Sequence, residues 1–254
     1  MLRRRFSSMG MALAGALAFA LPVAAGQPWA DQKAKHPVVV ELYTSQGCNS
    51  CPPADALLGQ LAGRKDVVAL SFPVTYWDML GWRDTLASEA NTKRQKQYAK
   101  ELGRGGVYTP QMIIDGLKDV VGSRESAVQA AIAALADAAI VPVDLDGNHQ
   151  QVRIVVGQAP AGGREATIWL FRVQPQATVS IGDGENSGRT ISYRNVVRDI
   201  KAVGTWKGQP VSLTLPRAEA GNPHDGIAVV VQQGGYGRVV GAALIDHPNY
   251  DYVR

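Results

Sequence analysis

Residues 38–58, VVVELYTSQGCNSCPPADALL, contain the pattern that decides the fold. They open with Val38–Tyr43, a short apolar run rich in β-branched residues, as expected of a buried parallel strand. A polar turn follows, then two cysteines separated by two residues, and then apolar residues at helical spacing over 54–61. The stretch therefore predicts a strand, a turn that carries Cys48 and Cys51, and a helix that starts close to Cys51.

The rest of the chain predicts two kinds of structure. Up to residue 138, further strands and helices alternate, with strands at 67–72, 111–115 and 118–121 and helices at 88–102 and 123–137. The cysteines thus lie where the first strand meets the first helix, as in a thioredoxin-like α/β domain. From residue 139 onward, short strand-like runs are separated by Gly, Asp and Pro clusters, which predicts a mainly β, sandwich-like domain. The expected domains are residues 36–138 and 139–254; residues 190–206 fit either a strand or a short helix.

The first 25 residues have the features of an export signal. They combine Arg3, Arg4 and Arg5 with an apolar core at 11–20 and small residues at 23–25 that suit a signal peptidase. The arginines also match a twin-arginine pattern loosely. The apolar core is short for a bilayer span, which takes about 20 residues, although an uncleaved anchor remains an alternative. We expect a protein exported to the periplasm, with no stable membrane span after signal cleavage.

Composition narrows the possible classes of protein. The chain has 254 residues, 46% of them hydrophobic and 19% charged, which suits folded domains rather than a disordered chain. Without the three N-terminal arginines, the formal net charge falls from +4 to +1. A near-neutral mature protein gives no electrostatic reason to expect nucleic acid as a partner.

The cysteine pair supports several interpretations. The two cysteines fit a redox-active pair, a small structural disulfide or two inert thiols. A fourth interpretation is a copper(I) site, because two thiolates can hold that ion. The redox interpretation rests on the helix start, where unpaired backbone amides stabilise the nucleophilic thiolate. It makes Cys48 the exposed attacking residue, with a moderately lowered pKa, and Cys51 the more buried resolving residue.

Two further features fit the same site. Glu41 lies in an otherwise apolar strand, where a carboxylate is costly to bury unless it has a task such as taking the proton of Cys51. The alternative for Glu41 is an edge or strand-end position that reaches water. Pro110 precedes a predicted strand, and its place in the topology favours a cis Thr109–Pro110 bond beside the cysteines.

Several segments resemble the secreted thioredoxin-like family catalogued as domain of unknown function 1223. They are residues 38–58, Tyr76–Asp84 (YWDMLGWRD), Val107–Gly116 (VYTPQMIIDG), 194–198 (RNVVR) and 206–208 (WKG). The resemblance covers nearly the whole mature chain. It implies a fold and a site, but no established substrate.

More broadly, the first half is similar to thioredoxins. This similarity implies the roles of attacking cysteine, resolving cysteine, buried acid and cis-proline for Cys48, Cys51, Glu41 and Pro110. Glu replaces the usual Asp, and the turn before Cys48 is one residue longer than in thioredoxin. The family catalogued as domain of unknown function 1223 often has His and Asp before its Tyr-Trp-Asp motif. This chain has Pro73 and Thr75 at those positions.

Two other segments have alternative interpretations. Tyr76, Trp77 and Asp78 begin an irregular segment that either caps the cysteine pair or forms a packed loop whose Asp side chains bind local backbone. Residues 182–188, GDGENSG, form either a flexible hairpin turn or a calcium-binding loop, although they lack the spacing of a dedicated calcium loop. The four histidines show no metal-ligand spacing, so we expect neither a metal nor a cofactor.

The function predicted from the sequence is an exported thiol–disulfide oxidoreductase. It would exchange its Cys48–Cys51 pair with protein thiols and disulfides, and would need an electron-transfer partner that the sequence does not identify. The alternatives are a thioredoxin-fold binding or scaffold protein with a structural disulfide and, less favoured, a copper(I) carrier.

Overall fold

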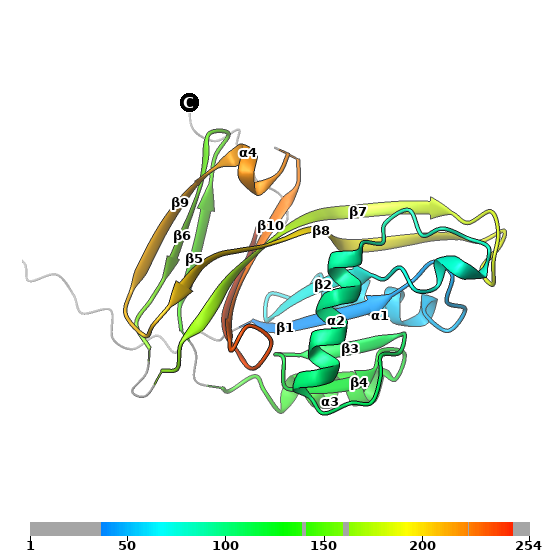
Figure 1. Cartoon of the computed structure of the whole chain (residues 1–254), viewed down its shortest axis with the longest axis horizontal. Helices are drawn as coiled ribbons and strands as arrows, with labels where there is room; N and C mark the ends of the chain where they lie inside the picture. The colour runs from blue at the N-terminus through cyan, green and yellow to red at the C-terminus, as the bar shows by residue number, and fades with distance from the viewer. Residues whose placement is uncertain (1–36, 139–140, 160–162, 223, 246–254) are drawn as a thin grey trace, which may run out of the picture. The chain divides into compact units, whose positions relative to one another are not determined.

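The structure is a computed structural model that describes residues 37–138, 141–159, 163–222 and 224–245. In the first range, strands and helices alternate as predicted (Figure 1). The first helix begins at Pro52, directly after Cys51. The elements there are β1 (Val38–Thr44), α1 (Pro52–Leu61), β2 (Val67–Pro73), the short 3-10 helix η1 (Asp78–Leu80), α2 (Glu89–Glu101), β3 (Gln111–Ile114), β4 (Lys118–Val121) and α3 (Glu125–Ala133).

The strands of this half pair in the order β2-β1-β3-β4. The central strand β1 runs parallel to β2 and antiparallel to β3. Because successive side chains of a strand point to opposite faces, β1 contributes to two cores. Val40 and Leu42 pack with residues of α1 and α3, whereas Val39 and Tyr43 lie in a second core with Tyr98 of α2. The sheet is therefore covered by helices on both faces, with α1 and α2 on opposite sides.

Strands dominate the second half, as predicted. The segment 190–206, for which a strand and a short helix were both considered, is one long strand that pairs with its neighbour as an antiparallel hairpin (Figure 1). The elements are β5 (Val143–Gly147), β6 (Gln151–Val156), β7 (Ala166–Ser180), β8 (Thr190–Trp206), β9 (Val211–Pro216), α4 (Arg217–Ala220), β10 (Gly226–Gln233) and β11 (Val239–Ile245).

The strands of the two halves form one mixed sheet of eight strands, in the order β11-β10-β7-β8-β2-β1-β3-β4. The join is a parallel contact between β2 and β8, where Ser71 pairs with Val196 and the side chain of Asn195 donates to the Ala69 carbonyl at 2.9 Å. A separate three-stranded sheet, β5-β6-β9, shares a hydrophobic core with β7, β10 and β11. The expected division into an α/β domain and a separate β-sandwich is not confirmed, because strand pairing continues across the predicted boundary at residue 138.

Among the described residues, no helix has the length and apolar character needed to cross a membrane. The predicted signal segment, residues 1–25, lies outside the described residues.

Candidate functional site

Cys48 and Cys51 form a disulfide between the end of β1 and the start of α1. The Cys51 amide donates to the Cys48 carbonyl at 3.2 Å, which closes the turn, and Cys51 is the N-cap of α1. Proline at the first two helical positions fits this helix start, because those positions need no intrahelical N–H bond. Cys48 therefore lies just ahead of the helix, as the two prolines predicted.

Both cysteines are fully buried. Cys48 and Cys51 are each 0% exposed, whereas Asn49 and Ser50 between them are exposed. The prediction that Cys48 is more accessible than Cys51 is therefore wrong for the disulfide-bonded protein. The sequence around the cysteines could not reveal this, because residues distant in the chain lie against the cysteine turn; Asn186, at the far end of the β7–β8 hairpin, bonds to the Cys48 carbonyl.

The segment that bonds to the cysteine turn is the β7–β8 tip, residues 181–189, which joins the two long strands. The side-chain amide of Asn186 donates to the carbonyl oxygens of Gln46 and Cys48, both at 2.9 Å. The backbone N–H of Asn49 donates to a carboxylate oxygen of Glu185 at 3.1 Å. The tip thus bonds to the main chain two residues before Cys48, at Cys48 and directly after it.

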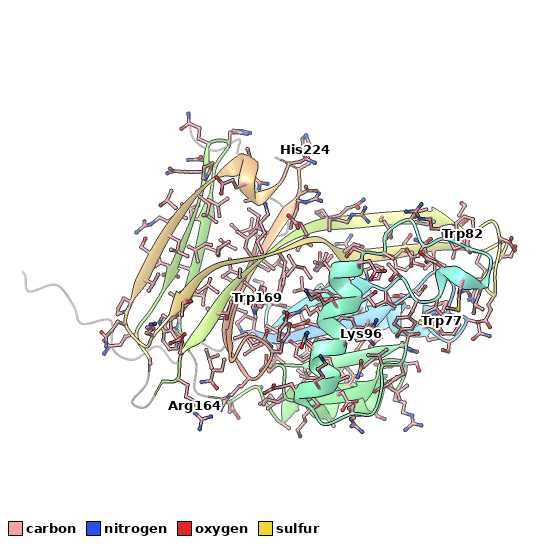
Figure 2. All side chains as sticks on the ribbon, viewed as in Figure 1. Trp77, Trp82, Lys96, Arg164, Trp169 and His224 are labelled. Carbon is pink, nitrogen blue, oxygen red and sulfur yellow. A yellow bond between two sulfur atoms is a disulfide. The ribbon has the colours of Figure 1, made fainter. Side chains whose placement is uncertain are left out.

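The tryptophan-rich segment after β2 supports this arrangement. Trp82 donates its indole N–H to the Gln46 side chain at 2.8 Å, and Figure 2 shows Trp82 beside the end of the β7–β8 hairpin. Asp84 accepts the backbone N–H of Gln46 at 2.8 Å, and Asp78 accepts that of Asp84 at 3.0 Å. The packed-loop interpretation, in which Asp side chains bind backbone, is confirmed for both Asp residues, and Trp82 also joins the loop to the turn before Cys48.

The Thr109–Pro110 bond is cis, as predicted. Tyr43 of β1 pairs with Gln111 of β3, so Pro110 lies at the end of the sheet where β1 leads into the cysteine turn. Trp77 connects the two regions. Its indole N–H donates to the Thr109 hydroxyl at 2.9 Å, and its Cβ lies 3.2 Å from where a Cβ on Gly47 would stand. Tyr76, the other aromatic residue predicted near the site, packs partly buried against the core on the α2 side of the sheet.

Glu41 bonds to Arg94 and two tyrosines on the face of the sheet away from α1. It is 1% exposed on a central strand, so the alternative of an edge position that reaches water is wrong. Its carboxylate oxygens accept hydrogen bonds from Arg94 and from the hydroxyls of Tyr43 and Tyr98, all between 2.7 and 2.9 Å. Its side chain lies on the α2 face of β1, opposite the face on which α1 packs. This arrangement gives the predicted proton transfer from Cys51 no support.

A different carboxyl group, Asp55, was missed by the sequence analysis. It is 4% exposed in the first turn of α1, and its backbone N–H donates to the Cys51 carbonyl at 3.1 Å. Within the described part of the chain, neither carboxylate oxygen accepts a hydrogen bond of normal geometry, and the Thr44 hydroxyl is its polar neighbour. Burial raises the pKa of Asp55 to about 7, opposed by the neighbouring Thr44 hydroxyl and increased slightly by Asp84. The sequence signal for it was an acid one helical turn after Cys51, adjoining the apolar face of the helix.

A tyrosine of the second half lies near this carboxyl group. Tyr193 of β8 is 2% exposed, and its hydroxyl forms no hydrogen bond with any residue that the structure describes. Burial, followed by the charges of Asp55 and Asp84, raises the pKa of Tyr193. The region around the start of α1 therefore contains a buried and incompletely paired set of polar groups from both halves of the chain.

The described residues contain no group of three or more His, Cys, Asp or Glu side chains arranged to hold a metal ion. In the segment 182–188, weighed above as a calcium loop, the Asp183 carboxylate accepts the adjacent Gly184 N–H at 2.7 Å. Glu185 and Asn186 bond to the cysteine turn instead. The loop is a hairpin turn, as favoured from its composition.

Comparisons with known proteins agree with the architecture. A crystal structure of protein AGR_C_4864 from Agrobacterium tumefaciens is 35% identical, with a TM-score of 0.77, over 88% of this chain and 99% of that chain. HBP35 of Porphyromonas gingivalis is 11% identical, with a TM-score of 0.57, over 85% of this chain and 76% of that chain, a likeness of fold alone. No curated protein matches the chain. A family model matches residues 39–232, and the chain therefore belongs to the family described as "Protein of unknown function (DUF1223)".

Proposed function

We propose that the protein is an exported thiol–disulfide oxidoreductase that uses Cys48 and Cys51. The observation that carries this proposal is the disulfide between the end of β1 and the start of α1, at the end of the sheet that also holds the cis Thr109–Pro110 bond. A strand-to-helix turn brings a thiolate close to unpaired helix amides, which favours its negative charge. The signal-like features of residues 1–25 support export, and an oxidising compartment suits a disulfide.

The strand order supports a thioredoxin-like first half. Strands β2-β1-β3-β4 combine a parallel β1–β2 pair with antiparallel β3 and β4, and helices cover both faces. The packing of β5-β6-β9 on β7, β10 and β11 supports a sandwich-like second half. In this proposal, the two halves share one sheet, and the β7–β8 hairpin of the second half bonds to the cysteine turn of the first.

The proposed exchange proceeds through a mixed disulfide. A client thiolate attacks the Cys48 sulfur, forms a bond to it and breaks the Cys48–Cys51 bond, so Cys51 leaves as a thiolate and takes up a proton. A second client thiolate then attacks the client sulfur, which forms the client disulfide and releases Cys48 as a thiolate. Two electrons pass from the client to the cysteine pair. The reverse sequence of steps reduces a client disulfide.

Asp55 is our candidate for the proton exchanged with Cys51. It lies one helical turn after Cys51, is buried, and has a pKa raised by that burial to about 7. A general acid or base is most effective when its pKa lies near the working pH. Asp55 takes the role that the sequence analysis gave to Glu41.

A catalysed exchange reaction tests the function. The wild-type protein should accelerate the reduction of a protein disulfide by dithiothreitol, and should equilibrate its own pair with glutathione. Cys48→Ser should abolish the acceleration because it removes the proposed attacking sulfur. A wild-type protein that gives no acceleration over dithiothreitol alone would refute the proposed activity.

One observation favours a second candidate, a binding or scaffold protein with a structural disulfide. Both cysteines are 0% exposed, as expected of a disulfide that only holds the turn together. Closing a four-residue loop stabilises a fold by about 2 kcal/mol in the chain-entropy model. This candidate predicts the same loss of stability for Cys48→Ala and Cys51→Ala, and no exchange with clients.

A further inference from the structure

The main-chain groups around Cys48 are already occupied by another part of the chain. The carbonyl oxygens of Gln46 and Cys48 accept from the side-chain amide of Asn186, and the N–H of Asn49 donates to the Glu185 carboxylate. These contacts join residues 136 to 140 positions apart in the sequence. The β7–β8 tip therefore satisfies backbone groups of the cysteine turn.

The chemistry of these contacts matches that of a polypeptide backbone. A carboxamide N–H donates as a peptide N–H does, and a carboxylate oxygen accepts as a peptide carbonyl does. An extended segment presents both kinds of group along its length, and main-chain pairing of this kind is a general mode of peptide recognition. The tip thus presents donors and an acceptor where a client segment carrying a cysteine could present its own.

We infer that the β7–β8 tip occupies the docking place of an extended polypeptide, and that a client reaches Cys48 by displacing Asn186 and Glu185. The inference rests on the proposed function and names its substrate class, an extended protein segment around a cysteine. A small thiol opens the same site less readily, because it cannot replace the hydrogen bonds that the tip gives up. The second half of the chain then acts as a selective cover for the disulfide.

The closed arrangement is held together by further contacts within the tip. Arg189 donates to the side-chain carbonyl of Asn186 at 2.8 Å, and Asn186 is 1% exposed. The Trp82 ring lies 3.1 Å from where a Cβ on Gly182 would stand, and Figure 2 shows Trp82 beside the hairpin end. The tip is therefore a formed structure bonded to the cysteine turn, and neither cysteine is exposed. A client thiolate can reach Cys48 only after a covering segment moves, and our inference assigns that movement to the tip.

The first test measures opening with a small reagent. The disulfide of the full mature chain is reduced by dithiothreitol in excess at constant pH, and the thiols that appear are counted over time. When opening is fast, the rate is proportional to the population of open molecules. Each lost hydrogen bond changes that population by about 2- to 10-fold. Asn186→Ala should therefore be reduced at least about 4-fold faster than wild type, and Glu185→Ala about 2-fold faster or more.

The matched control lies in the same tip. The Ser187 hydroxyl donates to the Gly182 carbonyl at 3.1 Å and has no bond to the cysteine turn. Ser187→Ala should keep the wild-type rate of reduction within about 2-fold. Glu185 is exposed, so its variant keeps the test decisive if Asn186→Ala fails to fold. Unchanged reduction rates in folded Asn186→Ala and Glu185→Ala would overturn the inference.

The second test asks which partner replaces the tip. A cysteine-containing peptide is compared with the same peptide N-methylated at the residues beside the cysteine, and with a peptide methylated far from it. The unmodified and remotely methylated peptide thiols should open the wild-type disulfide several-fold faster than the locally methylated one. Equal rates for the three would contradict docking of an extended backbone.

The two tests separate the inference from the function. In one outcome, the tip variants are reduced faster and the peptides react in the expected order, but the protein catalyses no turnover of protein disulfides. This outcome would support displacement of the tip by a client and refute the proposed oxidoreductase activity. In the opposite outcome, the protein catalyses turnover but the tip variants are reduced at the wild-type rate. This outcome would refute displacement of the tip and support the oxidoreductase activity.

Discussion

Arg94 of α2 holds Glu41 of β1 through two hydrogen bonds of 2.7 Å. The side chains are 2% and 1% exposed, and the Arg94 guanidinium also lies 5.0 to 5.8 Å from the centres of five aromatic rings. Those rings belong to Phe72, Tyr98, Trp169, Phe171 and Tyr236. The pair therefore joins the first half of the chain to β7 and to the turn between β10 and β11.

Arg94→Met should strongly destabilise the protein. It leaves the Glu41 carboxylate buried without its cation, and removing one partner of a buried pair costs about 3–5 kcal/mol. Arg64→Met is the control, since Arg64 forms an exposed pair with Asp66 at 2.7 Å and should lose less than about 1 kcal/mol. Urea denaturation measures both losses. Similar values for the two variants would show that the buried pair adds nothing special to stability.

Glu41→Gln tests whether this carboxylate handles protons for the cysteines. We expect the variant, where folded, to exchange thiols and disulfides within about 3-fold of the wild-type rate, because Glu41 is bonded to Arg94 on the other face of the sheet from α1. General acid–base groups contribute about 10²- to 10⁴-fold. A loss of that size, with the pH profile of the rate displaced, would return Glu41 to the role first predicted for it.

Asp55→Asn should change how stability depends on pH. Burial raises the pKa of Asp55 from 3.8 to about 7, so the folded protein binds its proton more tightly than the unfolded chain does. The stability that comes from this proton is complete below about pH 4 and is lost as the pH rises to about 7, a change of about 4 kcal/mol. Asparagine carries no such proton, so the variant should match wild type near pH 4 and be more stable near pH 8. A variant that is less stable than wild type at both pH values would contradict the assignment.

The local part of the site could be predicted from the sequence. The β-branched run before the cysteines, the prolines after Cys51 and the apolar spacing of α1 are short-range signals, and the strand, turn and helix formed as expected. The cis bond before Pro110 followed from its place in the topology. The strand, turn and helix depend on backbone preferences and periodicity within a few residues of each other, whereas the cis bond depended on the predicted topology.

The partners of the site could not be predicted in this way. Glu41 has its cation 53 residues away, and Asn186 lies 138 residues from the Cys48 carbonyl it bonds. The alternation of β1 showed that Glu41 shares a face with Val39 and Tyr43, but not which helix covers that face. The single β2–β8 pairing at Ser71 likewise has no local signal, so the sequence predicted two domains where one sheet continues.

The most direct test of the oxidoreductase proposal compares Cys51→Ala with Cys48→Ala in cells that export the protein. Extracts are quenched with acid, free thiols are blocked, and the protein is examined on a non-reducing gel. Cys51→Ala should accumulate mixed disulfides with clients, because Cys48 still attacks and the second thiol that resolves the intermediate is missing. Cys48→Ala should accumulate none. Equal amounts of both variants on the gel, with no mixed disulfides from either, would contradict the proposal and favour a structural disulfide.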